Sequence, residues 1–305
     1  MKRLAGFVLV AGALLAGAAE AAPAPDVAYS AYQTGHYRLA QAEALKRIEA
    51  DSNDAAAMTL VGELYRQGLG IAPDQKAATE WYERANERGD INATFALATQ
   101  LLDEKSGQRD PARAGALLEK AAAAGHPAAN YNLAIALLAT NREADDKRAV
   151  ACLEIAAKAQ VGDAMYALGI LAKQGRGMPA SEEVAARWMK QASVAGNVPG
   201  EVEYAIMLFN GTGVEKDETA AANLFLRAAW QGNPIAQNRL AKLYQFGLGI
   251  APDTIEAAAW HLAARAQGLK DPALDELFDR LKPEQQARAA RIAGGRISTA
   301  VLTAP

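Results

Sequence analysis

A repeat of 36 residues constrains this chain of 305 residues more than any other feature of its sequence. Pairs of glycines separated by one residue begin at Gly175, Gly211 and Gly247, each 36 residues after the one before. A fourth pair begins at Gly68, 107 residues before Gly175, which is one residue short of three periods. Self-similarity at such a period is typical of stacked repeat proteins, whose extended surfaces serve binding. The period therefore predicts a solenoid and favours a binding function over a catalytic one.

Each repeat is predicted to hold two helices. The first helix carries a large residue followed by a small one, from Val61-Gly62 in the first repeat to Leu240-Ala241 in the sixth. The second helix has alanine in all six repeats at one position and again seven residues later: Ala78, Ala114, Ala149, Ala185, Ala221 and Ala257, then Ala85, Ala121, Ala156, Ala192, Ala228 and Ala264. Large and small side chains alternating on one helical face indicate two closely packed antiparallel helices.

A capping residue is predicted before every second helix: Asp74, Asp110, Asp145, Ser181, Asp217 and Asp253. The side-chain oxygen of such a residue accepts a hydrogen bond from a backbone N–H of the first turn and stabilises the helix by about 1 kcal/mol. The second and third repeats lack the glycine pair, so their loops, Asp103–Arg109 and Thr140–Ala144, are predicted to be the least regular.

The combined pattern resembles that of Sel1-like repeat proteins, and the resemblance covers about residues 54–270. The first repeat shows it in five short segments: Val61–Tyr65, Gly68–Ile71, Asp74, Lys76-Ala77 and Trp81-Tyr82. The resemblance implies an all-α fold, a right-handed α-solenoid of antiparallel helix pairs with six repeats. It also implies an adaptor or regulator that works through protein contacts, and exported bacterial members resemble signalling regulators and envelope-assembly factors.

The predicted domain organisation follows from the repeat. A signal peptide is assigned to 1–21 and an N-terminal capping helix pair to 22–53. The six repeats are assigned to 54–89, 90–125, 126–160, 161–196, 197–232 and 233–268, within 54–270. Capping helices follow at 271–295, with the second helix ending at Gly294-Gly295, and the tail 296–305 is predicted to be disordered.

The N-terminus has the features of an export signal. Lys2 and Arg3 precede the apolar run Leu4–Ala19, and Ala19-Glu20-Ala21 fits a cleavage site for signal peptidase. These features predict a periplasmic protein with no stable membrane anchor after cleavage; secretion from the cell is the alternative. The single cysteine, Cys152, excludes an internal disulfide.

Several functions are disfavoured by the sequence. A net charge of −3 argues against nucleic acid as a partner. The glycine pairs follow helices rather than strands, which argues against a nucleotide cofactor. His36, His126 and His261 fall in different repeats, so neither a metal site nor a nucleophile–base set can be assembled. We therefore expect no cofactor, no metal and no enzymatic activity.

Residues that differ between repeats while the framework stays constant are the candidates for binding. Trp230 occupies a position filled elsewhere by Glu87, Ala123, Lys158, Val194 and Ala266, and Phe246 replaces glutamine or asparagine before the first loop glycine. Both are expected to be exposed interface anchors in adjacent repeats at related ends of the stack. The alternative is that they pack against each other or against a cap.

The first helices supply a second set of candidates. Phe95, Tyr131 and Tyr166 share one register and form a predicted aromatic ladder, for which packing between repeats is favoured over exposure. The next position varies and includes Asn132, Glu203 and Arg239, which are expected on the concave surface, where a partner would bind.

The sequence thus favours an exported adaptor or regulator that binds a protein partner, such as the sensor domain of an envelope kinase or another envelope protein. The alternative is a structural scaffold in envelope or polysaccharide assembly that binds glycan or secretion machinery. An accessible aromatic ladder would favour glycan.

Overall fold

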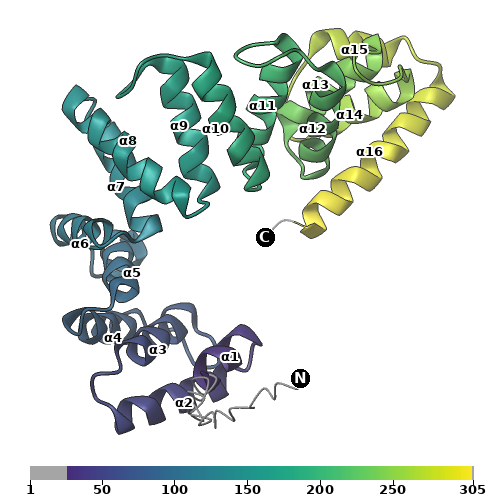
Figure 1. The fold of residues 1–305 in the computed structure, drawn as a ribbon. Coiled ribbons are helices and arrows are strands. Elements are labelled where there is room, and N and C mark those ends of the chain that lie inside the picture. The colour runs from purple at the N-terminus through teal and green to yellow at the C-terminus, as the bar shows by residue number, and fades with distance from the viewer. Residues whose placement is uncertain (1–25, 304–305) are drawn as a thin grey trace, which may run out of the picture. The chain divides into compact units, whose positions relative to one another are not determined.

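The computed structural model describes residues 26–303, and in this range the chain forms α-helices, one short 3-10 helix and no strand. The fold is an all-α repeat solenoid, as the 36-residue period predicts (Figure 1). The predicted signal peptide, 1–21, lies outside the described residues. Contacts divide the chain into two compact units, 1–81 and 82–305, with the boundary inside helix α4 (Gln75–Glu87).

The first unit contains α1 (Val27–Gln33), α2 (Tyr37–Ala50) and α3 (Ala55–Gln67). Arg47 of α2 connects the helices of this unit through hydrogen bonds. Its guanidinium donates to Asp26, the N-cap of α1, at 2.7 Å and to Asp54, the N-cap of α3, at 2.8 Å. One side chain therefore joins the beginnings of two helices.

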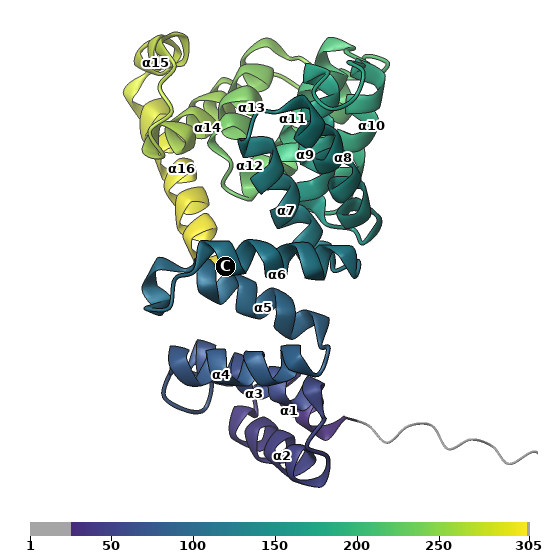
Figure 2. The ribbon, with the colours of Figure 1, turned by 90° about the vertical axis from the view of Figure 1, so that its left-hand side faces the viewer.

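The second unit is a succession of helix pairs, seen from another side in Figure 2. From α5 to α14 each helix packs against the next, and α16 packs against α14. The elements are α5 (Ile91–Leu102), η1 (Glu104–Ser106), α6 (Pro111–Ala123), α7 (Pro127–Ala139), α8 (Glu143–Lys158), α9 (Gly162–Gln174), α10 (Glu182–Val194), α11 (Val198–Asn210), α12 (Glu218–Trp230), α13 (Pro234–Phe246), α14 (Thr254–Ala266), α15 (Pro272–Asp279) and α16 (Pro283–Thr303).

The two alanine series of the second helices lie at the closest packing of each repeat. Every alanine of both series is 0% exposed. Between them on the same helices lies a third fully or nearly fully buried series: Tyr82, Leu118, Leu153, Met189, Phe225 and His261. A larger side chain at an alanine position would overpack this contact, which explains why alanine recurs there without exception.

Each glycine of a loop pair has its own structural role. The first glycine ends the first helix in the left-handed conformation, with φ of 66°, 71° and 68° at Gly175, Gly211 and Gly247. The second glycine contacts the preceding repeat, since a Cβ added at Gly177 would lie 2.5 Å from the carbonyl oxygen of Asp146. Added methyls at Gly213 and Gly249 would overlap the carbonyl oxygens of the first residues of α10 and α12.

Five of the predicted caps are confirmed, because the side chains of Asp74, Asp110, Ser181, Asp217 and Asp253 accept from backbone N–H groups. The prediction for Asp145 is wrong: α8 begins at Glu143 with Arg142 as its N-cap residue. The turn before α8 is tight, with Asn141 at a φ of 54°. Asp145 instead accepts from Thr140 at 2.7 Å and from Arg142 at 2.6 Å, and so fastens that turn.

The predicted C-terminal boundary is also wrong. Helix α16 does not end at Gly294-Gly295 but runs to Thr303, so 296–303 is helical rather than disordered; residues 304–305 lie outside the described range. A glycine within a helix costs about 1 kcal/mol, which weakens a helix without ending it. Beyond these glycines, Arg296 forms an ion pair with Glu256 of α14 at 2.5 Å and holds α16 in place.

Candidate protein-binding surface

A pocket of about 260 Å³ is formed by residues of α11, α12 and α13, with most of its wall on the first helices of repeats five and six. We call it the Phe246 pocket. It is lined by Ile206, Phe209, Asn210, Phe225, Arg239, Lys242, Leu243, Phe246 and Leu248.

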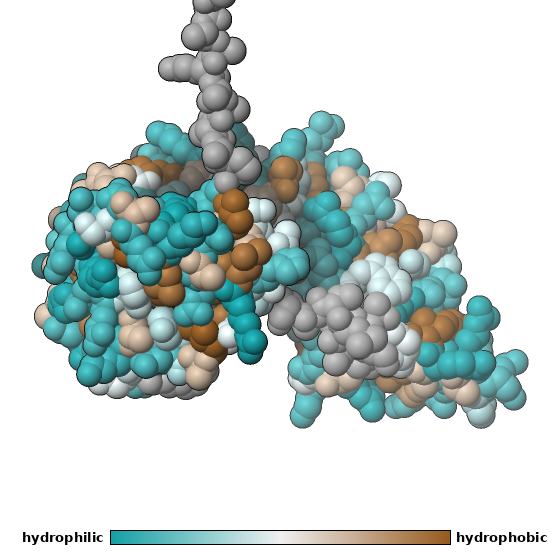
Figure 3. Space-filling model, turned by 90° about the horizontal axis from the view of Figure 1, so that it is seen from below, coloured by the Kyte–Doolittle hydropathy of each residue, from teal (hydrophilic) through white to brown (hydrophobic). Residues whose placement is uncertain are grey.

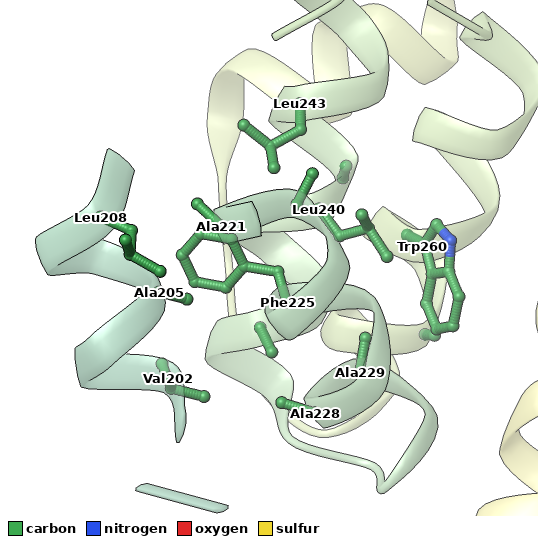
Figure 4. Close-up of a cluster of buried hydrophobic side chains, with 14 of the residues drawn as sticks. Val202, Ala205, Leu208, Ala221, Phe225, Ala228, Ala229, Leu240, Leu243 and Trp260 are labelled. Carbon is green, nitrogen blue, oxygen red and sulfur yellow. The ribbon is translucent and has the colours of Figure 1, made fainter. Parts of the chain in front are cut away.

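The floor of the pocket is part of the hydrophobic core. Phe225 and Leu243 are 2% and 4% exposed and belong to the buried cluster that joins α11, α12, α13 and α14. Figure 4 shows the Phe225 ring of α12 between Leu208 of α11 and Leu240 of α13. Because these side chains are fixed by packing, the floor is a rigid apolar surface.

One face of α13 supplies the wall. Arg239, Lys242, Leu243 and Phe246 are spaced at i, i+3, i+4 and i+7, the spacing that aligns side chains along a helix. Phe246 is the last residue of α13 and is 64% exposed, and Gly247 then turns the chain away from it. Arg239 is exposed on the same face. The structure therefore brings together two of the predicted binding residues, Phe246 and Arg239.

Lys242 is held in position from outside the repeat. Its ammonium lies 2.6 Å from the carboxylate of Asp271, the N-cap residue of α15, and Asn238 donates to the same carboxylate oxygen at 2.9 Å. Burial of Asp271 opposes its ionisation, but the hydrogen bonds from Lys242 and Asn238 prevail and lower its pKa below the usual value. The C-terminal cap thus positions a cation of the pocket wall.

Trp230 lies at a different place from Phe246, so the prediction of related ends is wrong. Trp230 ends α12, and α13 begins after only three residues, runs back in the opposite direction and ends at Phe246. A helix of 13 residues is about 20 Å long, which puts the two aromatics at opposite ends of the helix pair. Trp230 is 48% exposed and packs edge-on against Trp260, with ring centroids 5.3 Å apart.

The remaining variable positions are distributed along the stack. Glu203 lies on the face of α11 that also carries Ile206 and Asn210, and it pairs with Lys173 of α9 at 3.1 Å. Asn132 is half-buried on α7, two repeats away. Of these residues only Arg239 lines the pocket, while Glu203 is close along α11 but already engaged by a lysine.

The aromatic ladder is half-buried along its length. The Phe95 ring stacks on His126 of the next repeat, with centroids 4.5 Å apart. Tyr131 and Tyr166 pack against the core of repeats three and four. Burial raises the pKa of both hydroxyls, and for Tyr166 the nearby Glu203 raises it further. Packing between repeats, rather than a row of free rings, is therefore the arrangement observed.

Seven of the nine pocket residues were not predicted as binding residues: Ile206, Phe209, Asn210, Phe225, Lys242, Leu243 and Leu248. Phe209 and Asn210 are the last two residues of α11. They correspond to Gln245 and Phe246, the last two residues of α13 in the next repeat. Lys242 lies one turn before Phe246 and one turn after Arg239. Applying helical spacing around Phe246, in addition to comparing repeats, would have identified Lys242 from the sequence.

No metal-binding cluster is found among the residues described. Within them no three histidine, cysteine, aspartate or glutamate side chains are placed to hold a metal ion. The only cysteine, Cys152, is half-buried, and burial raises the pKa of its thiol. No described helix combines the length and the hydrophobicity needed to span a bilayer.

Comparison with known protein families gives one result that covers most of the chain. The model of the Sel1 repeat matches six times, at residues 55–90, 92–126, 127–161, 162–197, 199–233 and 234–269. Proteins with Sel1 repeats generally mediate contacts between proteins. No curated protein matches the chain significantly.

The solved structures that match this chain are distant in sequence. A protective antigen of uropathogenic Escherichia coli strains, which displays a Sel1-like repeat fold, is 23% identical with a TM-score of 0.73. The match covers 89% of this chain and 61% of the antigen, so this chain spans less than two thirds of that structure. A Sel1 repeat protein from Oxalobacter formigenes is 21% identical over 88% of this chain and 98% of its own, with a TM-score of 0.45.

Proposed function

The chain belongs to the Sel1 repeat family, and on this basis we propose that it is an exported adaptor that holds a protein partner at the Phe246 pocket. The partner is an envelope protein, such as the sensor domain of a kinase, and the adaptor regulates or scaffolds it. The proposal assigns the chain no catalytic step, because the pocket contains no nucleophile–base pair.

The observation that carries the proposal is the exposure of Phe246 beside a preformed apolar pocket. Its ring is 64% exposed, although its neighbours Leu243 and Phe225 are buried. On the face seen in Figure 3, hydrophobic side chains occur in small groups between hydrophilic ones. An aromatic side chain next to a rigid pocket, with an arginine at its rim, has the composition of an interface hot spot.

Export is supported by the sequence of the N-terminus alone. Lys2 and Arg3, the apolar run Leu4–Ala19 and the Ala19-Glu20-Ala21 site together have the order of a cleavable signal peptide. Fractionation of cells that express the full chain tests this point. We expect a periplasmic product whose first residue is Ala22; a full-length cytoplasmic product would contradict it.

Crosslinking in cells, followed by affinity purification and mass spectrometry, tests the binding function. The wild-type chain is compared with Phe246→Ala and with Val194→Ala, a control at the end of α10 that is 81% exposed. We expect one envelope protein to be captured by the wild type and by the control but lost from Phe246→Ala. A partner that all three chains capture equally would place the binding surface elsewhere.

A further inference from the structure

The Phe246 pocket is large enough for one or two apolar side chains and lies just below the size range of pockets for drug-sized molecules. Its volume is about 260 Å³, whereas pockets for drug-sized molecules and cofactors are typically about 300–1,000 Å³. The buried Phe225 and Leu243 form its floor, and the half-buried Phe209 and the exposed Phe246 flank it. This surface fits one or two apolar side chains of a partner.

The charged side chains that line the pocket are both cationic, although the chain as a whole is acidic. Arg239 and Lys242 line it, and no carboxylate does. Lys216 adds a third cation near the edge, 5.8 Å from the Phe209 ring. Lys242 is paired with Asp271 and Lys216 with Glu218, so these two cations are largely neutralised. Arg239 is exposed, and it is therefore the cation that can pair with an anionic group of a partner. It provides this positive charge although the whole chain has a net charge of −3.

The polar rim favours an extended segment over a helix. The exposed amide of Asn210, across the pocket from α13, offers both a donor and an acceptor. In a helix the backbone N–H and C=O groups are hydrogen-bonded to each other. A partner segment can therefore offer its backbone N–H and C=O to the Asn210 amide only when it is not helical. Asn210 on α11 and Arg239 on α13 therefore provide one contact for the backbone and one for a carboxylate.

We infer that the Phe246 pocket recognises an extended acidic peptide segment of the partner. A large apolar side chain of the segment fills the space between Phe209 and Phe246. The carboxylate of a neighbouring aspartate or glutamate pairs with Arg239, and the Asn210 amide bonds to the peptide backbone. This inference rests on the proposed function, and it adds the chemical class of the partner's binding motif.

Selection from a random heptapeptide library displayed on beads tests the inference with the purified chain. The wild type is compared with Arg239→Glu, which reverses the charge at the rim, and with Arg288→Glu, the same change at an exposed position of α16. We expect the wild type and Arg288→Glu to retain peptides with an acidic residue beside a large apolar one. Arg239→Glu should weaken the best such peptide about tenfold or more, equivalent to about 1.4 kcal/mol, and should retain basic peptides instead.

Two results would overturn the inference. One is a peptide preference that is indifferent to charge or is unchanged by Arg239→Glu. The other is that no peptide is retained although Phe246→Ala still loses the partner in cells; the partner would then present a folded surface, and the proposed function would stand without the peptide motif. A third outcome is that the pocket binds acidic peptides but the Phe246→Ala chain still captures its partner in cells. That outcome would overturn the proposed function, while the peptide preference of the pocket would stand.

Discussion

The guanidinium carbon of Arg296 lies 3.8 Å from the centroid of the Trp260 indole ring. Trp260 is 1% exposed, whereas Trp188, which occupies the same position in repeat four, is only half-buried. The difference arises because α16 packs on α14 at the end of the stack, and Arg296 covers the ring while it pairs with Glu256 at 2.5 Å. This contact between a cation and an aromatic ring fastens the C-terminal cap.

Replacing Arg296 with alanine is expected to loosen α16. The side chain is 9% exposed, and a desolvated cation–π contact is worth about 2 kcal/mol or more. Hydrogen exchange should show faster exchange in α16 and α14, and urea unfolding a lower midpoint. Arg288→Ala, on the exposed side of the same helix, is the control and should leave both unchanged. Equal exchange in the two variants would show that α16 is held by other contacts.

Gly213→Ala should destabilise the chain strongly. The residue has a φ of 64°, which costs a non-glycine residue about 1–2 kcal/mol, and the added methyl would also overlap the backbone of Glu182 in the preceding repeat. Gly196→Ala separates the two effects, because Gly196 has a φ of 81° but nothing within 4 Å of its added methyl. We expect Gly213→Ala to cost about 1–3 kcal/mol more than Gly196→Ala in urea unfolding. Equal costs would mean that the loop shifts away from α10 without penalty.

Two phenylalanines of the same pocket should separate binding from stability. Phe246→Ala removes a ring that is 64% exposed, so the free energy of unfolding should change by no more than about 0.5 kcal/mol while partner binding is lost. Phe225→Ala removes a ring that is 2% exposed and should cost about 3–5 kcal/mol. Thermal unfolding and partner capture on the same preparations measure both effects. A large loss of stability in Phe246→Ala would show that its ring supports the fold.

Acid should weaken the C-terminal cap through Asp271. Its pKa is lower in the folded chain than the usual value of about 3.9, so its ionised form stabilises the fold at higher pH. That contribution is complete above the unfolded pKa and is lost as the pH falls through the folded pKa. Asp271→Asn keeps a good N-cap residue but removes the charge. Between pH 7 and pH 3 the urea midpoint should therefore fall further in the wild type than in Asp271→Asn; parallel curves would exclude this role for Asp271.

The repeat pattern predicts the architecture because period, capping residues and small residues all reflect local helix geometry. Alanine recurs at Ala78 and Ala85 and at the matching positions of the five other repeats because the two helices of each repeat pack closely at these positions. The failures occur where local signals compete with tertiary contacts. Asp145 has the identity of a cap but stabilises a turn, and Gly294-Gly295 would favour a helix end if α16 did not pack on α14.

The candidate site is predictable only in part. Phe246 and Arg239 differ from their counterparts in other repeats, and comparison of repeats identifies both. The same comparison selects Trp230, but it carries no information about which end of a helix pair a side chain occupies. Helical spacing from Phe246 identifies Lys242 as its neighbour on α13, but the ion pair with Asp271, outside the repeats, becomes evident only from the structure.

The second glycine of each loop has a consequence for how such a chain can grow. Gly177 of repeat four fits against the Asp146 carbonyl of repeat three, and the Glu182 carbonyl of repeat four receives Gly213 of repeat five. Each 36-residue repeat thus has a loop glycine that contacts the preceding repeat and a backbone carbonyl that the loop glycine of the next repeat contacts. Tandem duplication of such a block within a gene would create a matched junction at once, without further mutation, so the length of the array can change over evolution while the interior repeats stay the same.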